Sequence, residues 1–235
     1  MIARPSRFPN PRETTPEGIV AVGGDLMVET LIDAYSHGIF PWPQDGLPML
    51  WFSPPERGII DLTQELHAPE RFLRDFGKWV ANPEFEIRVD TAFERVIDEC
   101  RLSYRPNQNG TWILREMQEA YQGMHSIGLA HSVEVFWSGE LVGGLYGVFL
   151  RGVFSGESMF HRKKNFGKAA LWATMNLLKK NGIAMIDVQM VTPVVQTFGG
   201  QLIARDEYLS RLLAAQNDWE RQKCRFEWVK GRLSL

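Results

Sequence analysis

The sequence predicts an α+β protein in which a small N-terminal domain, residues 1–56, packs on a larger domain, residues 57–235. Two observations support this prediction. The first 56 residues are rich in proline and carry clusters of aromatic residues, whereas the remainder alternates between strand-like and helix-like hydrophobic periods. Several strands in succession, mixed with helices, are typical of an α+β fold.

The clearest pattern begins at His131. Apolar and polar residues alternate from His131 to Ser158, and turn signals interrupt the alternation at Ser138-Gly139 and at Arg151-Gly152. This pattern predicts a meander of three antiparallel strands.

A helix and a buried strand follow the meander. Apolar residues recur with helical spacing over residues 167–180, and Asn181-Gly182 supplies a C-terminal stop. Met185–Gln189 is a short, mostly apolar run of the kind that is buried in a sheet. A meander, a helix and a parallel-type strand, in this order, indicate the core of the GCN5-related N-acetyltransferase (GNAT) fold.

The start of this helix has two interpretations. It follows a basic turn, residues 161–165, and a helix N-terminus offers free N–H groups and a positive dipole to an anion. The segment Lys164–Ala169 also resembles the pyrophosphate loop of GNAT enzymes, with Lys where Gln or Arg is usual. The alternative is that the turn is purely structural, which is the commoner case.

Shorter patterns predict the other elements. An amphipathic helix is expected over residues 28–37, and Gly38 ends it. Aromatic clusters occur at residues 38–42 and 50–54. They either form the core of a small domain or form a platform on which a base or an apolar side chain stacks. Further strands are expected at 58–62, 85–89 and 225–230, further helices at 69–78, 91–101, 115–126 and 206–217, and a helical turn after residue 191.

Composition restricts the partners and the location. Lys and Arg total 26 against 28 Asp and Glu, so a polyanion would have to meet a local basic patch. Cys100 and Cys224 lack metal-ligand spacing and fit a reducing compartment. The N-terminus has no apolar signal segment, and no run approaches 18 apolar residues. We therefore expect a cytoplasmic protein that does not enter a membrane.

Ten short segments, in order over nearly the whole chain, form a far more specific signal than any single motif above. They are GIVAVGGDL at 18–26, AY at 34–35, GIFPW at 38–42, LWFSP at 50–54, GTWI at 110–113, EAY at 119–121, AHSVEV at 130–135, GGLYG at 143–147, GESMF at 156–160 and IDVQ at 186–189. With these segments the sequence resembles one family, the bacterial leucyl/phenylalanyl-tRNA–protein transferases of the N-end rule pathway.

The resemblance implies an activity and its partners. It implies an enzyme that transfers Leu or Phe, with Met as a further donor, from aminoacyl-tRNA to the N-terminal Lys or Arg of proteins, marking them for degradation. Because the aminoacyl ester is already activated, direct attack by the amine requires positioning, proton handling and oxyanion stabilisation. We expect no cofactor, no metal and no covalent intermediate, and a monomeric protein.

The resemblance also assigns catalytic roles. It gives Asp187 and Gln189 the handling of the proton, and alternate strand residues point to the same face, so the two side chains are expected to act together. Asp187 would hold and polarise Gln189, whose carbonyl oxygen accepts a hydrogen bond from the incoming amine. Glu157 would bind the α-amino group of the donor. The alternatives are a structural polar pair and an ordinary ion pair.

The resemblance further assigns binding residues, although apolar residues are core by default and a basic helix face is usually just solvated. Trp42 and Trp112 would flank the 3′ adenosine. The donor side-chain pocket would be lined by Leu145, Phe154, Met159, Ala170, Thr174 and Ile186, and the tRNA acceptor stem would be contacted by Arg71, Arg74, Lys78, Arg162, Lys163, Lys164 and Lys168.

Three departures put specificity in doubt, and two rival functions stay open. Thr174 stands where the family more often has Phe, so the pocket is expected to be larger or more polar unless Trp172 refills it. Val191–Val194 replaces a common Leu-Asn-Asp-His run, and Phe52 replaces a Trp. Donor or acceptor specificity could therefore be altered. The rivals are a CoA-dependent N-acetyltransferase, suggested by residues 164–169, and an inactive tRNA-binding module.

Overall fold

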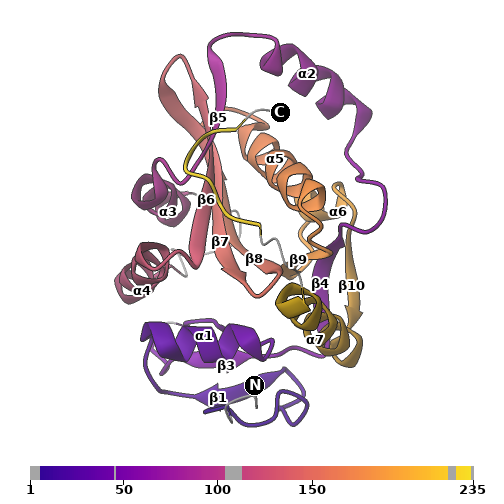
Figure 1. Ribbon diagram of the computed structural model, residues 1–235. Coiled ribbons are helices and arrows are strands. Elements are labelled where there is room, and N and C mark those ends of the chain that lie inside the picture. Colours follow the sequence, from indigo (N-terminus) through magenta and orange to yellow (C-terminus); the bar gives the residue numbers. More distant parts are fainter. Residues whose placement is uncertain (1–5, 45, 104–112, 222–225, 234–235) are drawn as a thin grey trace.

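The computed structural model describes residues 6–44, 46–103, 113–221 and 226–233, and it confirms the predicted α+β class. Its strands form a three-stranded sheet near the N-terminus and an eight-stranded sheet in the remainder. Figure 1 shows the N-terminal residues, in indigo, at one end of the molecule, with α2 and β5 at the opposite end. No helix in these described ranges has the length and apolar character needed to cross a membrane.

The small sheet belongs to the proline-rich segment, here named the N-terminal unit (residues 6–44 and 46–55). Its antiparallel strands are β1 (Ile19–Val22), β2 (Phe40–Pro41) and β3 (Leu50–Phe52), in the order β1-β3-β2. Strands of two to four residues give no readable alternation, which is why the sequence did not predict them. The helix α1 (Val28–Ser36) was predicted, and Gly38, with φ +75°, follows its end.

The large sheet has the strand order β10-β4-β9-β8-β7-β6-β5-β11. The meander β6-β7-β8 was predicted, and so was the parallel pairing of β8 with β9; the other described neighbours are antiparallel. Its strands are β4 (Glu56–Asp61), β5 (Phe85–Val89), β6 (Ala130–Trp137), β7 (Glu140–Leu150), β8 (Val153–His161), β9 (Met185–Gln189), β10 (Gly200–Ala204) and β11 (Gly231–Arg232). The small sheet ends at Phe52 and β4 begins at Glu56, and the domain boundary expected at residue 56 stays a prediction.

Near the C-terminus one expected strand is absent from the described residues and one observed strand was not predicted. Residues 226–230 form no strand, and the short β11 follows them. The edge strand β10 was missed because it follows two glycines and buries one side chain out of five, Ile203. Such a strand lacks the alternation that sequence reasoning relies on.

Helices cover both faces of the large sheet. The core on one face combines α2 (Glu70–Val80), α5 (Phe166–Lys180) and α6 (Pro193–Gln196) with the strands. The core on the other face combines α3 (Phe93–Leu102) and α4 (Arg115–Ser126) with the N-terminal unit. The helix α7 (Arg205–Arg221) packs against β4, β9 and β10. The N-terminal unit therefore shares a hydrophobic core with the large sheet.

The parallel strands β8 and β9 separate soon after they meet. They pair at Phe154 with Ile186 and at Ser155 with Asp187, and no further pair follows among these described strands. Beyond this point β8 continues through Glu157 while β9 ends at Gln189. The separation opens the sheet between Glu157 and Gln189, the two polar residues for which the sequence predicts a role.

Candidate active site

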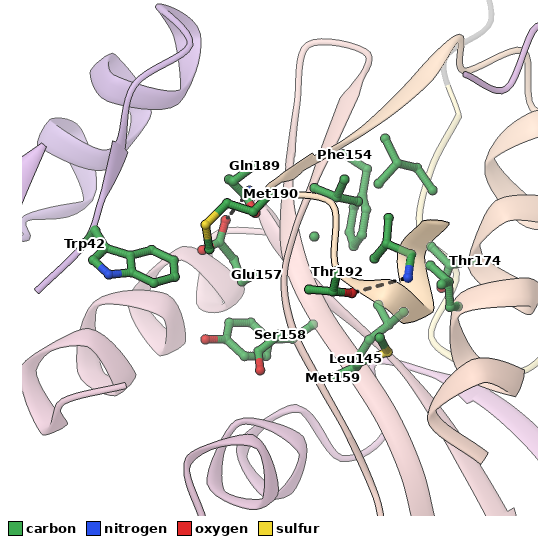
Figure 2. Close-up of a pocket in the computed structure, with 16 residues that line it drawn as sticks. Trp42, Leu145, Phe154, Glu157, Ser158, Met159, Thr174, Gln189, Met190 and Thr192 are labelled. Atoms are coloured by element: carbon green, nitrogen blue, oxygen red, sulfur yellow. Dashed lines mark hydrogen bonds between the residues drawn. The ribbon is translucent and has the colours of Figure 1, made fainter. Parts of the chain in front are cut away.

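A mostly apolar cavity of about 280 Å³ lies where β8 and β9 separate. In Figure 2, Thr174 and Leu145 lie at one end of this cavity, Trp42 lies at the other, and Glu157 and Gln189 stand between them. The cavity is lined by Trp42, Leu145, Tyr146, Phe154, Gly156, Glu157, Ser158, Met159, Leu171, Thr174, Ile186, Val188, Gln189, Met190, Thr192 and Val195.

The end of the cavity away from Trp42 is apolar. The Thr174 hydroxyl donates to the carbonyl oxygen of Ala170 across 2.9 Å, so its polar atom already has a partner within α5. Trp172 does not line the cavity and packs instead near Phe72 and Phe198, with ring centroids 6.5 and 6.3 Å away. Trp172 therefore does not refill the space beside Thr174.

Five of the six residues expected in the pocket line the cavity. Leu145, Phe154, Met159, Thr174 and Ile186 line it. Ala170 does not: it is fully buried in the core, and its neighbour Leu171 lines the cavity instead. Neighbouring residues of a helix point about 100° apart, so Leu171 can face the cavity while Ala170 faces the core.

Glu157 is directed by an irregularity in β8. Tyr146 pairs with Ser158 and Gly147 pairs with Gly156, so Glu157 is the extra residue of a β-bulge. Gly147 permits this close approach, since a Cβ there would lie 2.2 Å from the carbonyl oxygen of Ser155. The bulge leaves Glu157 lining the cavity.

The carboxyl of Glu157 is held by two tyrosines. Tyr121 donates to its Oε2 across 2.9 Å, and the hydroxyls of Tyr121 and Tyr35 lie 2.7 Å apart. Burial raises the pKa of Glu157 to about 7 and the negative charge of Asp187 adds to this, whereas hydrogen bonds from both tyrosines and the charge of Arg57 oppose it. Tyr35 comes from α1, so the N-terminal unit contributes to the site.

Asp187 and Gln189 make different contacts, and their expected joint action stays a prediction. Ile186 and Val188 line the cavity, and Asp187 between them is fully buried against Tyr208 of α7. Gln189 lines the cavity. Its φ of +54° lies in the left-handed region, and this turn of the backbone redirects its side chain.

The amide of Gln189 has two possible orientations with different hydrogen bonds. With Nε2 toward Glu157, it makes one long contact of 3.5 Å to Oε1. In the opposite orientation, Nε2 donates to the carbonyl oxygens of Val188 and Gly156 across 3.0 Å each. Two good hydrogen bonds outweigh one at the limit of distance, so the second orientation is favoured. The amide oxygen then faces Glu157 and is available as an acceptor.

Asp187 holds Gln189 by its backbone and not by its amide. Its Oδ1 accepts a hydrogen bond from the backbone N–H of Gln189 across 3.0 Å. The same carboxylate receives Arg57 Nε and Nη2 across 2.8 and 2.7 Å, and the Tyr208 hydroxyl across 2.9 Å. Sequence reasoning missed Arg57, although its alternation with the buried Ile59 along β4 indicates an inward side chain.

Of the two tryptophans expected to flank an adenosine, the structure describes Trp42 but not Trp112. Trp42 is half-buried and lines the cavity, and in Figure 2 it stands at the end beside Met190. Met190 is half-exposed, which makes this end the open side of the cavity. Trp112 lies outside the described residues.

The expected tRNA-binding residues fall on two elements that meet at one end of the molecule. Trp79 of α2 stacks on Phe166 of α5, with ring centroids 4.8 Å apart, which brings the end of α2 to the start of α5. Arg162 is held by Glu99 in an ion pair, with Nε 2.9 Å from Oε2. Exposed side chains in the set are Arg71, Arg74, Lys78, Arg162, Lys163 and Lys164, and Lys168 is half-buried.

The glycine of the loop that resembles a pyrophosphate site has a packing role. A Cβ at Gly167 would lie 2.8 Å from the carbonyl oxygen of Phe160 in β8. Phe166, beside it, is buried among aromatic rings that include Trp79. This geometry favours the structural interpretation of residues 164–169. Within the described ranges, no group of three or more His, Cys, Asp or Glu side chains is placed to hold a metal.

Comparison with known proteins identifies the family. A family model described as leucyl/phenylalanyl-tRNA protein transferase matches residues 62–213, and a model for the N-terminal domain of the same transferases matches residues 24–55. The leucyl/phenylalanyl-tRNA–protein transferase of Nitratidesulfovibrio vulgaris (strain DP4) is 44% identical over 205 residues, covering 87% of this chain and 86% of that protein. The Myxococcus xanthus protein of the same name is 43% identical over 227 residues, covering 97% of this chain and 94% of its own.

Among solved structures, L-PGS from Bacillus licheniformis aligns with a TM-score of 0.40 and 13% identity, over 83% of this chain and 71% of that one. The family model covers more than half of the chain, and the curated relatives exceed 40% identity over most of it. This chain belongs to the leucyl/phenylalanyl-tRNA–protein transferase family.

Proposed function

We propose that this protein is a cytoplasmic aminoacyltransferase that moves Leu or Phe, with Met as a further donor, from aminoacyl-tRNA to the N-terminal Lys or Arg of acceptor proteins. The observation that carries the proposal is the apolar cavity in which Glu157 and Gln189 stand between the apolar end and the open side. A closed apolar end suits an uncharged side chain, and a carboxylate beside it suits an ammonium. Such a site fits the end of an aminoacyl-tRNA. The resemblance to this family supports the proposed acceptors and their proposed degradation by the N-end rule pathway.

The reaction is proposed to be direct aminolysis. The acceptor amine attacks the ester carbonyl of the donor, a C–N bond forms, the ribose oxygen leaves, and the amine proton passes to that oxygen. The Gln189 amide oxygen accepts a hydrogen bond from the attacking amine and orients it. A neutral amide is a weak base, so its contribution is orientation rather than removal of the proton. Glu157 holds the α-amino group of the donor, and Trp42 flanks its adenosine.

The tRNA body is proposed to reach the basic residues of α2 and the start of α5. The contact is directed to the phosphate backbone and does not depend on sequence. Arg162 contributes least, because Glu99 already neutralises it.

The test supplies purified protein with labelled Phe-tRNA or labelled acetyl-CoA and with peptides that differ only in the first residue. The proposal expects Phe to appear on peptides that begin with Lys or Arg, and little transfer to a peptide that begins with Ala. Transfer from acetyl-CoA at a comparable rate, with none from Phe-tRNA, would contradict it.

A further inference from the structure

The guanidinium of Arg57 lies fully buried at the junction of three parts of the fold. Nε and Nη2 form a two-point ion pair with Asp187 of β9, and Nη1 donates to the Gly38 carbonyl oxygen of the N-terminal unit across 3.1 Å. Its Cζ lies 4.4 Å from the ring centroid of Phe40 and 4.5 Å from that of Tyr208, so one ring comes from the N-terminal unit and the other from α7.

The ion pair is connected to the backbone of the candidate site. Replacing a buried ion pair by apolar residues is often neutral or stabilising, so such a pair is weak evidence for a contribution to stability. Here the carboxylate partner also accepts a hydrogen bond from the backbone N–H of Gln189 across 3.0 Å. Gln189 has the unfavourable φ of +54° that directs its side chain into the cavity.

We propose that Arg57 is a positioning residue, which through Asp187 holds the backbone of Gln189 in the conformation that presents its amide to the reacting amine. Arg57 touches neither substrate nor cavity, because Asp187 stands between it and Gln189. The inference rests on the proposed function for the role of Gln189.

One turn of the N-terminal unit, residues 38–42, contacts both the Arg57 guanidinium and the open side of the cavity. Gly38 and Phe40 receive the guanidinium, and Trp42, two residues further, lines the open side of the cavity. A Cβ at Gly38 would lie 2.7 Å from Leu209 Cδ2 of α7, so this turn is wedged against the helix that carries Tyr208. The N-terminal unit is thus connected to Gln189 through Arg57 and Asp187.

The first test compares Arg57→Met, Gln189→Ala and the double variant in Phe-tRNA transfer. We expect Arg57→Met to lower kcat by about 10²-fold with little change in KM for Phe-tRNA, because small misplacements of an orienting group have effects of that size. The double variant should be no slower than the slower single variant. Rate reductions that multiply would overturn the proposal, since Arg57 would then act independently of Gln189.

A second pair of variants separates positioning from folding. Arg57→Met leaves Asp187 buried without its cation, whereas Arg57→Met/Asp187→Asn removes both charges and relieves that problem. We expect the double variant to regain cooperative unfolding but not kcat. Recovery of wild-type kcat would contradict the proposal. Arg211→Met is the matched control, because Arg211 of α7 pairs with Asp61 across 3.0 Å away from the cavity, and it should keep wild-type kcat.

A readout without substrate distinguishes this inference from the proposed function. The backbone amide signal of Gln189 in a ¹⁵N-glutamine-labelled protein, assigned by its disappearance in Gln189→Ala, should shift and lose exchange protection in Arg57→Met/Asp187→Asn relative to Asp187→Asn alone. An unmoved signal overturns the positioning role even if transfer from Phe-tRNA is confirmed. A shifted signal in a protein that transfers nothing from Phe-tRNA would uphold the positioning and refute the function.

Discussion

Asp187 accepts a hydrogen bond from the backbone N–H of Gln189 across 3.0 Å, and of these two residues Gln189 alone lines the cavity. Asp187 is fully buried in an ion pair, and Gln189 lines the cavity. The two residues therefore differ in their contacts: Asp187 binds the backbone N–H of Gln189, and Gln189 presents a polar side chain to the cavity.

These contacts predict different outcomes for the two residues. Gln189→Ala should lower kcat by about 10²–10³-fold with little effect on stability, because it removes one preorganised polar group. Asp187→Ala should lower kcat and also cost about 3–5 kcal/mol of unfolding free energy, because Arg57 stays charged and buried. Steady-state kinetics and thermal unfolding measure both. Gln201→Ala, at an exposed position in β10, is the control, and near wild-type turnover in Gln189→Ala would refute the assigned role.

Glu157 predicts a pH dependence of donor binding. Burial raises its pKa to about 7, so the carboxyl is largely neutral below that pH and cannot attract an ammonium. Affinity for 3′-phenylalanylamino adenosine should therefore rise with pH up to about 7, and Glu157→Gln should remove this rising limb. Calorimetric titration across pH measures it.

Glu134 supplies the control for this experiment. Burial also raises its pKa to about 7, but it does not line the cavity. Glu134→Gln should therefore keep the rising limb. Disappearance of the limb in Glu134→Gln, or its persistence in Glu157→Gln, would show that another group controls donor binding.

Thr174 predicts a shift in donor preference. Its position at the apolar end of the cavity leaves room for a long or aromatic side chain, so Phe and Met donors should gain relative to Leu. Thr174→Phe should lower the ratio of kcat/KM for Phe-tRNA over Leu-tRNA. Each buried methylene contributes about 0.8 kcal/mol, and such discrimination rarely exceeds about 200-fold.

Thr174→Val is the matched control, because the hydroxyl already bonds to Ala170 within the helix. This variant should keep the donor ratio of the native protein. If Thr174→Phe leaves the ratio unchanged, the donor side chain does not reach α5.

The basic surface predicts salt-dependent tRNA binding. Neutralising Arg71, Arg74 and Lys78 should reduce the slope of log affinity against log salt by about 0.7–0.9 for each phosphate that the protein no longer neutralises. Arg162→Gln should change it less, because Glu99 already pairs with Arg162. Filter binding of uncharged tRNA measures the slopes, with Arg221→Gln at the end of α7 as control. An unchanged slope in the α2 variant would mean that this face is merely solvated.

The helices and the meander could be predicted from the sequence because their hydrophobic periods are long. The direction of Gln189 could not, since glutamine seldom adopts a positive φ and nothing local signals it. Arg57 was overlooked as one charge in a short strand, and its inward direction depends on the partner Asp187, 130 residues away. The Glu157 bulge likewise depends on how β8 meets β7, and sequence periodicity does not contain that information.

The central claim is that Glu157 binds the α-amino group of a donor whose side chain fills the cavity. Its most direct test compares Phe-tRNA with phenyllactyl-tRNA, in which a hydroxyl replaces that amino group. A hydrogen bond between charged groups contributes about 1.5–3 kcal/mol, so native protein should favour Phe-tRNA by about 10- to 100-fold in kcat/KM. Glu157→Gln should abolish most of this preference. Equal use of the two donors by the native protein would contradict the account.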